Sequence, residues 1–100
     1  MAVVFLTITP IGTGTPSVSA YVAGVERILR ETSLRHQLTA MGTIIEGDLD
    51  EILAVVRRMH EHPFTQGAVR VSTLLKIDDR RDREHTIAGK MRSVESKLGD

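Results

Sequence analysis

The sequence contains no cysteine, and this absence excludes several kinds of site at once. Disulfide bonds, thiolate metal centres and a cysteine nucleophile all need the thiol group. The chain also lacks tryptophan, and its aromatic side chains are limited to Phe5, Tyr21 and Phe64. A flat ligand that needs apolar cover on its faces must therefore use Phe5, Tyr21 or the soft surface of Met41.

An excess of one charge is also missing, because 13 Lys and Arg residues balance 13 Asp and Glu residues. We expect no nucleic-acid partner, since phosphate contacts need a concentrated positive surface. The opening MAVVFLTITP has neither a basic region nor an apolar stretch long enough for a signal peptide or a membrane span. The sequence therefore predicts a soluble, cytoplasmic protein with no membrane partner.

The length of 100 residues fits a single domain over residues 1–100. A domain of this size buries only a modest fraction of its surface, so it gains from the further burial that self-association provides.

Hydrophobic periodicity predicts four strands and three helices. The strands are expected at 2–9, 35–39, 43–46 and 68–78. The helices are expected to begin at Pro16, at Asp48 and near Ile87, and Pro63 is expected to end the second one. A capping box of Asp48 and Glu51 marks the start of that second helix. Apolar residues recur at helical spacing in all three: Val18, Val22, Val25, Leu29; Leu49, Ile52, Val56, Met59; Ile87, Met91, Val94, Leu98.

The order βαββαβα predicts an α+β fold, a ferredoxin-like βαββαβ sandwich with an extra C-terminal helix and a four-stranded antiparallel sheet. Two helices would cover one face of the sheet and leave the other open. On the first strand, alternation separates Val4, Leu6 and Ile8 from the other side chains, yet neither set is charged. We therefore expect a second subunit to cover the open face, in a homo-oligomer that is a tetramer built from two dimers.

The segment GTGTPS, residues 12–17, leads from the first strand into the first helix. Glycines allow close approach to a ligand, and a helix N-terminus attracts anions. The segment nevertheless matches neither GxGxxG nor GxxxxGK[ST], and it contains no lysine. A purely structural use remains open, in which Thr15 or Ser17 caps the helix and Pro16 occupies its first turn. We also expect Ser17 and Ser19 to face a pocket.

Four segments resemble the small thiamine-binding protein family, which is related to the YkoF-like proteins. They are IGTGTPSVSAYV, LTAMGTIIEGDLDEIL, RMHEHPF and KIDDRRDREHTIAGKMRSVESKL, and the resemblance covers essentially the whole chain in order. It implies a ferredoxin-like subunit that assembles into dimers and tetramers through its sheets. It also implies a pocket for thiamine or its hydroxymethylpyrimidine part near a subunit interface, and no catalytic activity.

The residues themselves are compatible with such a ligand. An aminopyrimidine has an edge of donors and acceptors that hydroxyls and a carboxylate can match, and flat faces that need apolar cover. Glu46 could pair with the amino group or balance the thiazolium charge, or it could simply be a carboxylate at the end of a hairpin or in the turn that follows. The predicted ligand-binding residues are Phe5, Thr7, Thr9, Ser17, Ser19, Thr39, Met41, Thr43 and Glu46.

No metal site and no required cofactor are expected. His60 and His62 are two residues apart and are not neighbours on a helix surface, and Asp78 and Asp79 would point to opposite sides of a strand. Three functions remain open. The first is a non-catalytic, oligomeric binder of thiamine or hydroxymethylpyrimidine; the second is a phosphate-binding or other anion-binding protein or enzyme that uses the GTGTPS segment; the third is a structural assembly module.

Overall fold

The computed structural model describes residues 1–14 and 18–99. Its elements are β1 (Ala2–Pro10), α1 (Ser19–Arg30), β2 (Arg35–Leu38), β3 (Thr43–Gly47), α2 (Leu49–Thr65), β4 (Val71–Asp79) and α3 (Ile87–Leu98). The predicted order of strands and helices is confirmed, and with it the α+β fold of ferredoxin-like type. No helix in these two ranges is long and apolar enough to cross a membrane.

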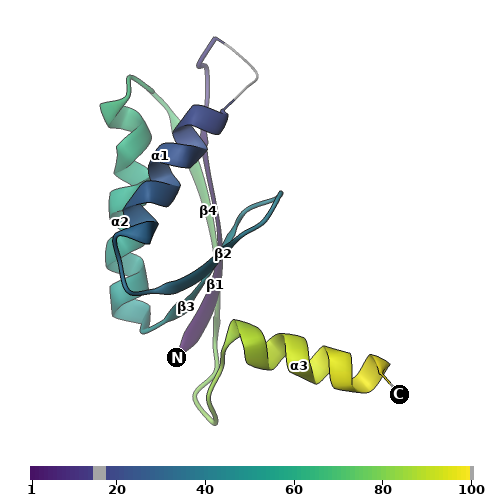
Figure 1. Ribbon diagram of the computed structural model, residues 1–100. Coiled ribbons are helices and arrows are strands. Elements are labelled where there is room, and N and C mark those ends of the chain that lie inside the picture. Colours follow the sequence, from purple (N-terminus) through teal and green to yellow (C-terminus); the bar gives the residue numbers. More distant parts are fainter. Residues whose placement is uncertain (15–17, 100) are drawn as a thin grey trace.

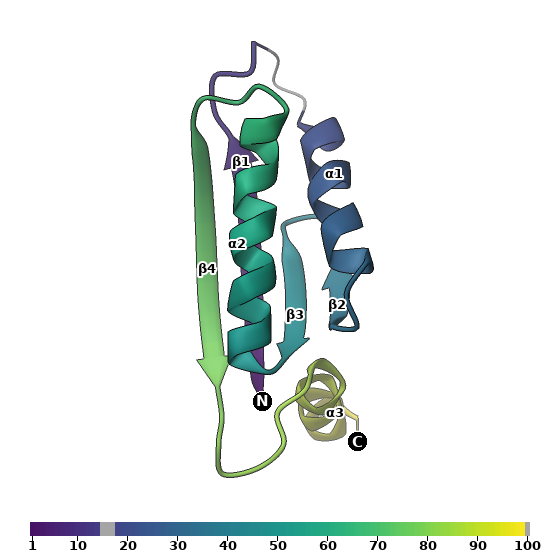
Figure 2. The ribbon, with the colours of Figure 1, turned by 90° about the vertical axis from the view of Figure 1, so that its left-hand side faces the viewer.

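The four strands form one antiparallel sheet in the order β2-β3-β1-β4. Helices α1 and α2 lie side by side on one face of this sheet (Figures 1 and 2). Helix α3 lies on the other side and is seen end-on in Figure 2, so it projects away from the sheet. The sheet therefore has one face covered by two helices and one face that α3 touches only near its end.

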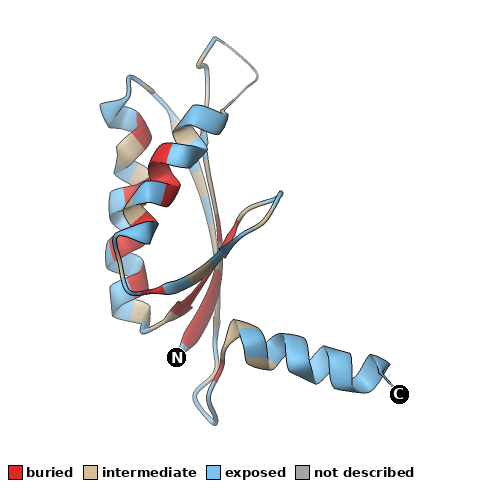
Figure 3. Cartoon of the chain, viewed as in Figure 1, coloured by how far each residue is buried: buried red, intermediate tan, exposed pale blue. Residues whose placement is uncertain are grey.

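The core lies between the sheet and the first two helices (Figure 3). Val4 pairs with Ile45 across β1 and β3, and both side chains point toward the helices. They meet Leu29 of α1 and Met59 of α2, which are fully buried. The predicted helical stripes of α1 and α2 thus face the side of β1 that carries Val4 and Leu6, which explains why these segments fold into two layers.

The start of α2 is as predicted, but its end is not. The Asp48 carboxylate accepts a hydrogen bond from the backbone N–H of Glu51 at 3.1 Å, so Asp48 caps the helix. The expectation that Pro63 ends α2 is wrong, because the helix continues to Thr65. A proline near a helix C-terminus removes a single backbone donor, and the Pro63 ring is fully buried, so the loss is offset by packing.

Two other element boundaries differ from the prediction. Strand β4 begins at Val71 rather than at residue 68, because the N–H of Ala68 bonds the carbonyl of Pro63 and Gly67 has a φ of 97°, which completes a turn instead. Helix α1 begins at Ser19 after Val18, which makes no side-chain capping bond. The predicted capping roles of Thr15 and Ser17, and the place of Pro16, lie outside the described residues.

Candidate functional site

A notch in the sheet forms one pocket of the molecule. Strand β3 pairs with β1 only as far as Leu6 opposite Thr43, whereas β1 continues to Pro10 beside β4. In the described part of the chain, one backbone edge of β1 beyond Leu6 therefore has no strand beside it. Helix α1 and the hairpin of β2 and β3 border this edge and enclose a cavity of about 160 Å³.

The wall of this pocket is mostly apolar. Its apolar side chains come from α1, α2, β1 and the hairpin, and they include Leu6, Ile8, Val18, Val22, Val25, Leu38, Met41 and Met59. Met59 is fully buried, while Met41 is 81% exposed at the tip of the hairpin. The pocket thus includes one buried and one exposed flexible thioether, and such side chains can adapt to a flat ring.

One carboxylate side chain lines this mostly apolar pocket. Glu26 of α1 lines the pocket and is only 7% exposed. Its Oε2 accepts a hydrogen bond from the Thr43 hydroxyl at 3.2 Å, which is its one donor among the described residues. A carboxylate offers about four acceptor positions. Burial therefore leaves Glu26 with unused acceptor capacity, which a ligand that donates N–H groups would satisfy.

The turn between β2 and β3 is shaped by Thr39. Its hydroxyl donates to the carbonyl of Gly42 at 2.8 Å and accepts from the N–H groups of Met41 and Gly42, both at 3.2 Å. A Cβ on Gly42 would lie 2.9 Å from the carbonyl oxygen of Leu6, so only glycine lets the hairpin approach β1 this closely. The turn thereby fixes the position of the pocket wall.

Five of the predicted ligand-binding residues line this one pocket: Thr7, Thr9, Thr39, Met41 and Thr43. The hydroxyls of Thr39 and Thr43 are already engaged in the turn and with Glu26. Those of Thr7 and Thr9 bond to no other described residue, and alternation along β1 places both side chains on the sheet face of Phe5.

Three of the others lie elsewhere, and the fourth, Ser17, is outside the described residues. Phe5 lies on the opposite sheet face, in an apolar groove beside α3. Ser19 is the exposed first residue of α1 and does not line the pocket.

Glu46 is buried, but at the far end of β3 from the notch. Its Oε2 accepts a hydrogen bond from the backbone N–H of Ile87 at 2.5 Å, at the start of α3. It is therefore neither an exposed hairpin-end group nor part of the turn into α2. A role for Glu46 in ligand binding stays a prediction, and its visible contact in this structure is with α3.

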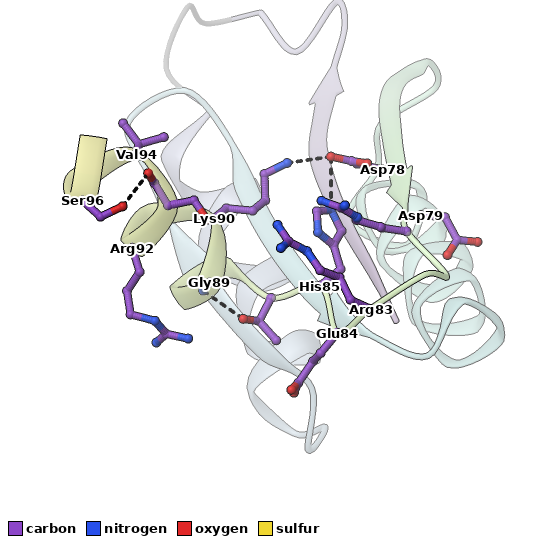
Figure 4. A pocket seen from close by; sticks show the side chains of 13 residues that line it. Asp78, Asp79, Arg83, Glu84, His85, Gly89, Lys90, Arg92, Val94 and Ser96 are labelled. Atoms are coloured by element: carbon purple, nitrogen blue, oxygen red, sulfur yellow. Dashed lines mark hydrogen bonds and ion pairs between the residues drawn. The ribbon is translucent and has the colours of Figure 1, made fainter. Parts of the chain in front are cut away.

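A second and larger hollow, of about 940 Å³, opens between the end of β4 and α3 (Figure 4). Asp78 lines it, with its carboxylate 2.6 Å from Lys90 Nζ and 3.2 Å from His85 Nε2. These neighbours lower the pKa of Asp78, the Lys90 hydrogen bond most and the His85 ring next. Because these groups pair with one another, we interpret the hollow as the place where α3 is attached to the end of β4. No group of three or more His, Asp or Glu that could hold a metal ion occurs in the described ranges.

Glu26 is the residue that the sequence interpretation missed. It lies four residues after Val22 and three before Leu29, and both belong to the apolar stripe of α1. Helical spacing therefore places this acid on the buried face. A charged residue inside an apolar stripe is the signal that would have identified it.

Comparison with known proteins agrees with this fold. The sequence matches the thiamine-binding protein family over residues 4–95. It is 50% identical to the UPF0045 protein YqgV of Bacillus subtilis, over 98% of both chains. The structure of the hypothetical protein MJ1052 of Methanocaldococcus jannaschii superposes with a TM-score of 0.85 at 38% identity, covering 93% of this chain and 94% of that one.

A more distant structure is that of TM0486 from Thermotoga maritima, which is described as a thiamine biosynthesis or salvage protein. It gives a TM-score of 0.75 at 19% identity, with 93% and 97% of the two chains covered, and so shows the fold alone. The family match extends from the inner strand β1 into the last turns of α3 and includes Glu26 and the notch. The chain is a member of the thiamine-binding protein family.

Proposed function

We propose that this protein binds thiamine or its hydroxymethylpyrimidine part in the notch pocket, without catalysing a reaction on it. The observation that carries the proposal is Glu26, a buried carboxylate with spare acceptor positions in a mostly apolar pocket. An exocyclic amino group of a pyrimidine donates N–H bonds that such a carboxylate accepts. The family match supports the same ligand class.

The size of the pocket supports binding of one ring. A volume of about 160 Å³ is well below the roughly 300–1,000 Å³ typical of sites for drug-sized ligands. In our proposal the aminopyrimidine enters, with Met41 and Val22 against it, and the free backbone edge of β1 supplies further donors and acceptors. The thiazolium ring then lies at the mouth of the pocket.

The chemistry of the lining favours binding over catalysis. Glu26 is the one ionisable side chain that lines the pocket within the described residues. General acid–base or nucleophilic catalysis uses a second group within hydrogen-bond reach of the first. The alternative of an anion site has less support here, because these lining residues include no Lys, Arg or His.

Titration calorimetry with separate ligand parts tests the proposal. Thiamine and hydroxymethylpyrimidine should both bind, while the thiazole alcohol alone should release no measurable heat. Inorganic phosphate serves as the probe for the anion alternative. Binding of phosphate without binding of the pyrimidine would refute our proposal and favour that alternative.

Thermal unfolding gives an independent check of the same ligands. A ligand present at 100 times its dissociation constant stabilises the folded state by about 2.7 kcal/mol. For a domain of this size, that corresponds to a rise in melting temperature of roughly ten degrees or more. If neither thiamine nor hydroxymethylpyrimidine raised the melting temperature at millimolar concentration, the notch would not be a site for them.

A further inference from the structure

The Glu26 carboxylate is separated from the positive charges of the chain. It is 7% exposed, and no Lys, Arg or His lines the notch pocket within the described residues. Arg27 and Arg30 follow it on α1, but both are exposed, and the ion pairs of the described ranges do not include Glu26. Buried charges in proteins are normally paired. A ligand that brings a positive charge to Glu26 would therefore complete the site.

A second titratable group approaches this region from α2. The His62 ring lies against Gly24 of α1, where an added Cβ would be 2.5 Å from His62 Nε2. His62 is half-buried and does not line the notch pocket. The lining from β1, from β3 and from the hairpin between β2 and β3 includes no ionisable side chain among the described residues. Proton binding at the pocket therefore depends on Glu26, with His62 as the group to control for.

Both oxygens of Glu26 can accept from a ligand. Oε2 accepts from the Thr43 hydroxyl and keeps a second acceptor position. Oε1 has no partner in the described part of the chain, and it is not among the fully enclosed side-chain atoms there, so it retains surface that a ligand can reach. The carboxylate thus offers two acceptors side by side, and it matches a ligand edge that carries two parallel donors.

A neutral aminopyrimidine lacks such an edge. Its amino group donates, but the ring nitrogen beside the amino-bearing carbon carries a lone pair and accepts. An ionised carboxylate only accepts, so one of its oxygens would face the ring lone pair, which is costly where little water is present. A proton on that ring nitrogen creates two parallel N–H donors. These pair with a carboxylate as the fork of an arginine guanidinium does.

On the basis of the proposed function, we propose that the notch binds the aminopyrimidine in its protonated form, so that binding takes up one proton from the solvent. The proton forms an N–H bond at the ring nitrogen, and the resulting cation and Glu26 are together neutral. The preferred ligands are flat bases of the amidine type, in which an amino group and a basic ring nitrogen share a carbon. In hydroxymethylpyrimidine the substituent that bears the thiazolium of thiamine lies on the other side of the amino group, toward the mouth of the pocket.

The direction of the pH dependence follows from this proton count. Glutamate carboxyls and aminopyrimidines are ordinarily unprotonated at neutral pH, whereas the complex holds one proton. Between about pH 6.5 and 8.5, the association constant should therefore fall about tenfold for each unit by which the pH rises. In Glu26→Gln, the amide offers one acceptor and one donor, which match the neutral ring. Its affinity should not change with pH.

Titration calorimetry with hydroxymethylpyrimidine counts the protons directly. Measurements at one pH in two buffers with different ionisation enthalpies give the number taken up, and a pH series gives the slope. The wild type and His62→Gln should take up about one proton, and Glu26→Gln none. If Glu26→Gln binds tenfold to a hundredfold more weakly at neutral pH, its affinity should equal that of the wild type about one to two pH units higher. Circular dichroism checks the fold of both variants.

The possible failures are distinguishable. Binding by the wild type without proton uptake, at an affinity independent of pH, would overturn this inference and leave the proposed function intact. A slope that is lost in His62→Gln would also overturn it, because His62 would then be the titrating group. Absence of hydroxymethylpyrimidine binding at every pH would overturn the inference and the proposed function together.

Discussion

Replacing Glu26 with glutamine tests whether its carboxylate binds a ligand or only supports the structure. The amide keeps an oxygen that can accept from the Thr43 hydroxyl, and its shape is nearly the same. What changes is the charge at a site that is 7% exposed. The substitution should therefore weaken ligand binding without lowering the stability of the ligand-free protein.

The magnitudes follow from the contacts of Glu26. A hydrogen bond to a charged group contributes about 1.5–3 kcal/mol, so losing it should weaken binding of hydroxymethylpyrimidine by roughly tenfold to a hundredfold. Without ligand, the buried charge has a single neutral donor among the described residues. Removing a poorly compensated buried charge is often neutral or stabilising. The free energy of unfolding should stay equal or rise, by up to about 1 kcal/mol.

Calorimetry of the wild type, Glu26→Gln and Glu31→Gln with hydroxymethylpyrimidine measures the affinity, and urea unfolding measures the stability. Glu31 lies in solvent just after α1, so its variant should match the wild type in both experiments. Our reasoning about Glu26 would be refuted if Glu26→Gln lost stability and kept its affinity. Glu26 would then be a structural partner of Thr43 and nothing more.

Three further outcomes are expected. Gly42→Ala should destabilise the protein by about 1–3 kcal/mol and weaken pyrimidine binding, because the added Cβ would lie 2.9 Å from the Leu6 carbonyl and push the hairpin outward; urea unfolding that matches the wild type would contradict this. Met59→Ala should cost about 2–5 kcal/mol, measured in the same way, because the side chain is fully buried in the core. The lowered pKa of Asp78 means that its contacts stabilise the fold above the ordinary value near 4, and that this contribution is lost as the pH falls through the lower folded value. Amide exchange in α3 should therefore accelerate in that acidic range in the wild type, and Asp78→Asn, the control, should exchange faster already at neutral pH.

The fold could be predicted because local signals agree with one another. The apolar stripes of α1 and α2 agree with the buried faces of these helices in the structure, and Asp48 marks a helix start by a local hydrogen bond. The errors occur where tertiary packing overrides a local rule. Pro63 stays inside α2 because its ring is buried, which the sequence around it does not reveal.

The site was harder to predict, because it depends on which elements meet. The threonines of the hairpin and of β1 were identified correctly as neighbours, since strand pairing brings Thr43 opposite Leu6. Glu46 was expected near the ligand, yet the structure shows it bound to the first N–H of α3, a contact between positions 41 residues apart. Glu26 was missed because the buried face of each helix was identified from its apolar residues alone.

The central claim is that the ligand occupies the notch beside Glu26, and the four methionines of the chain can test it in one titration. Met41 and Met59 line the notch, whereas Met91 lies in the groove at α3 and Met1 is outside both. Methyl-labelled methionines can be followed by NMR while thiamine is added. The account predicts that the Met41 and Met59 signals shift together with saturation, while Met1 and Met91 stay unchanged. A saturable shift of Met91 with Met41 and Met59 unmoved would place the ligand at α3 and contradict the account.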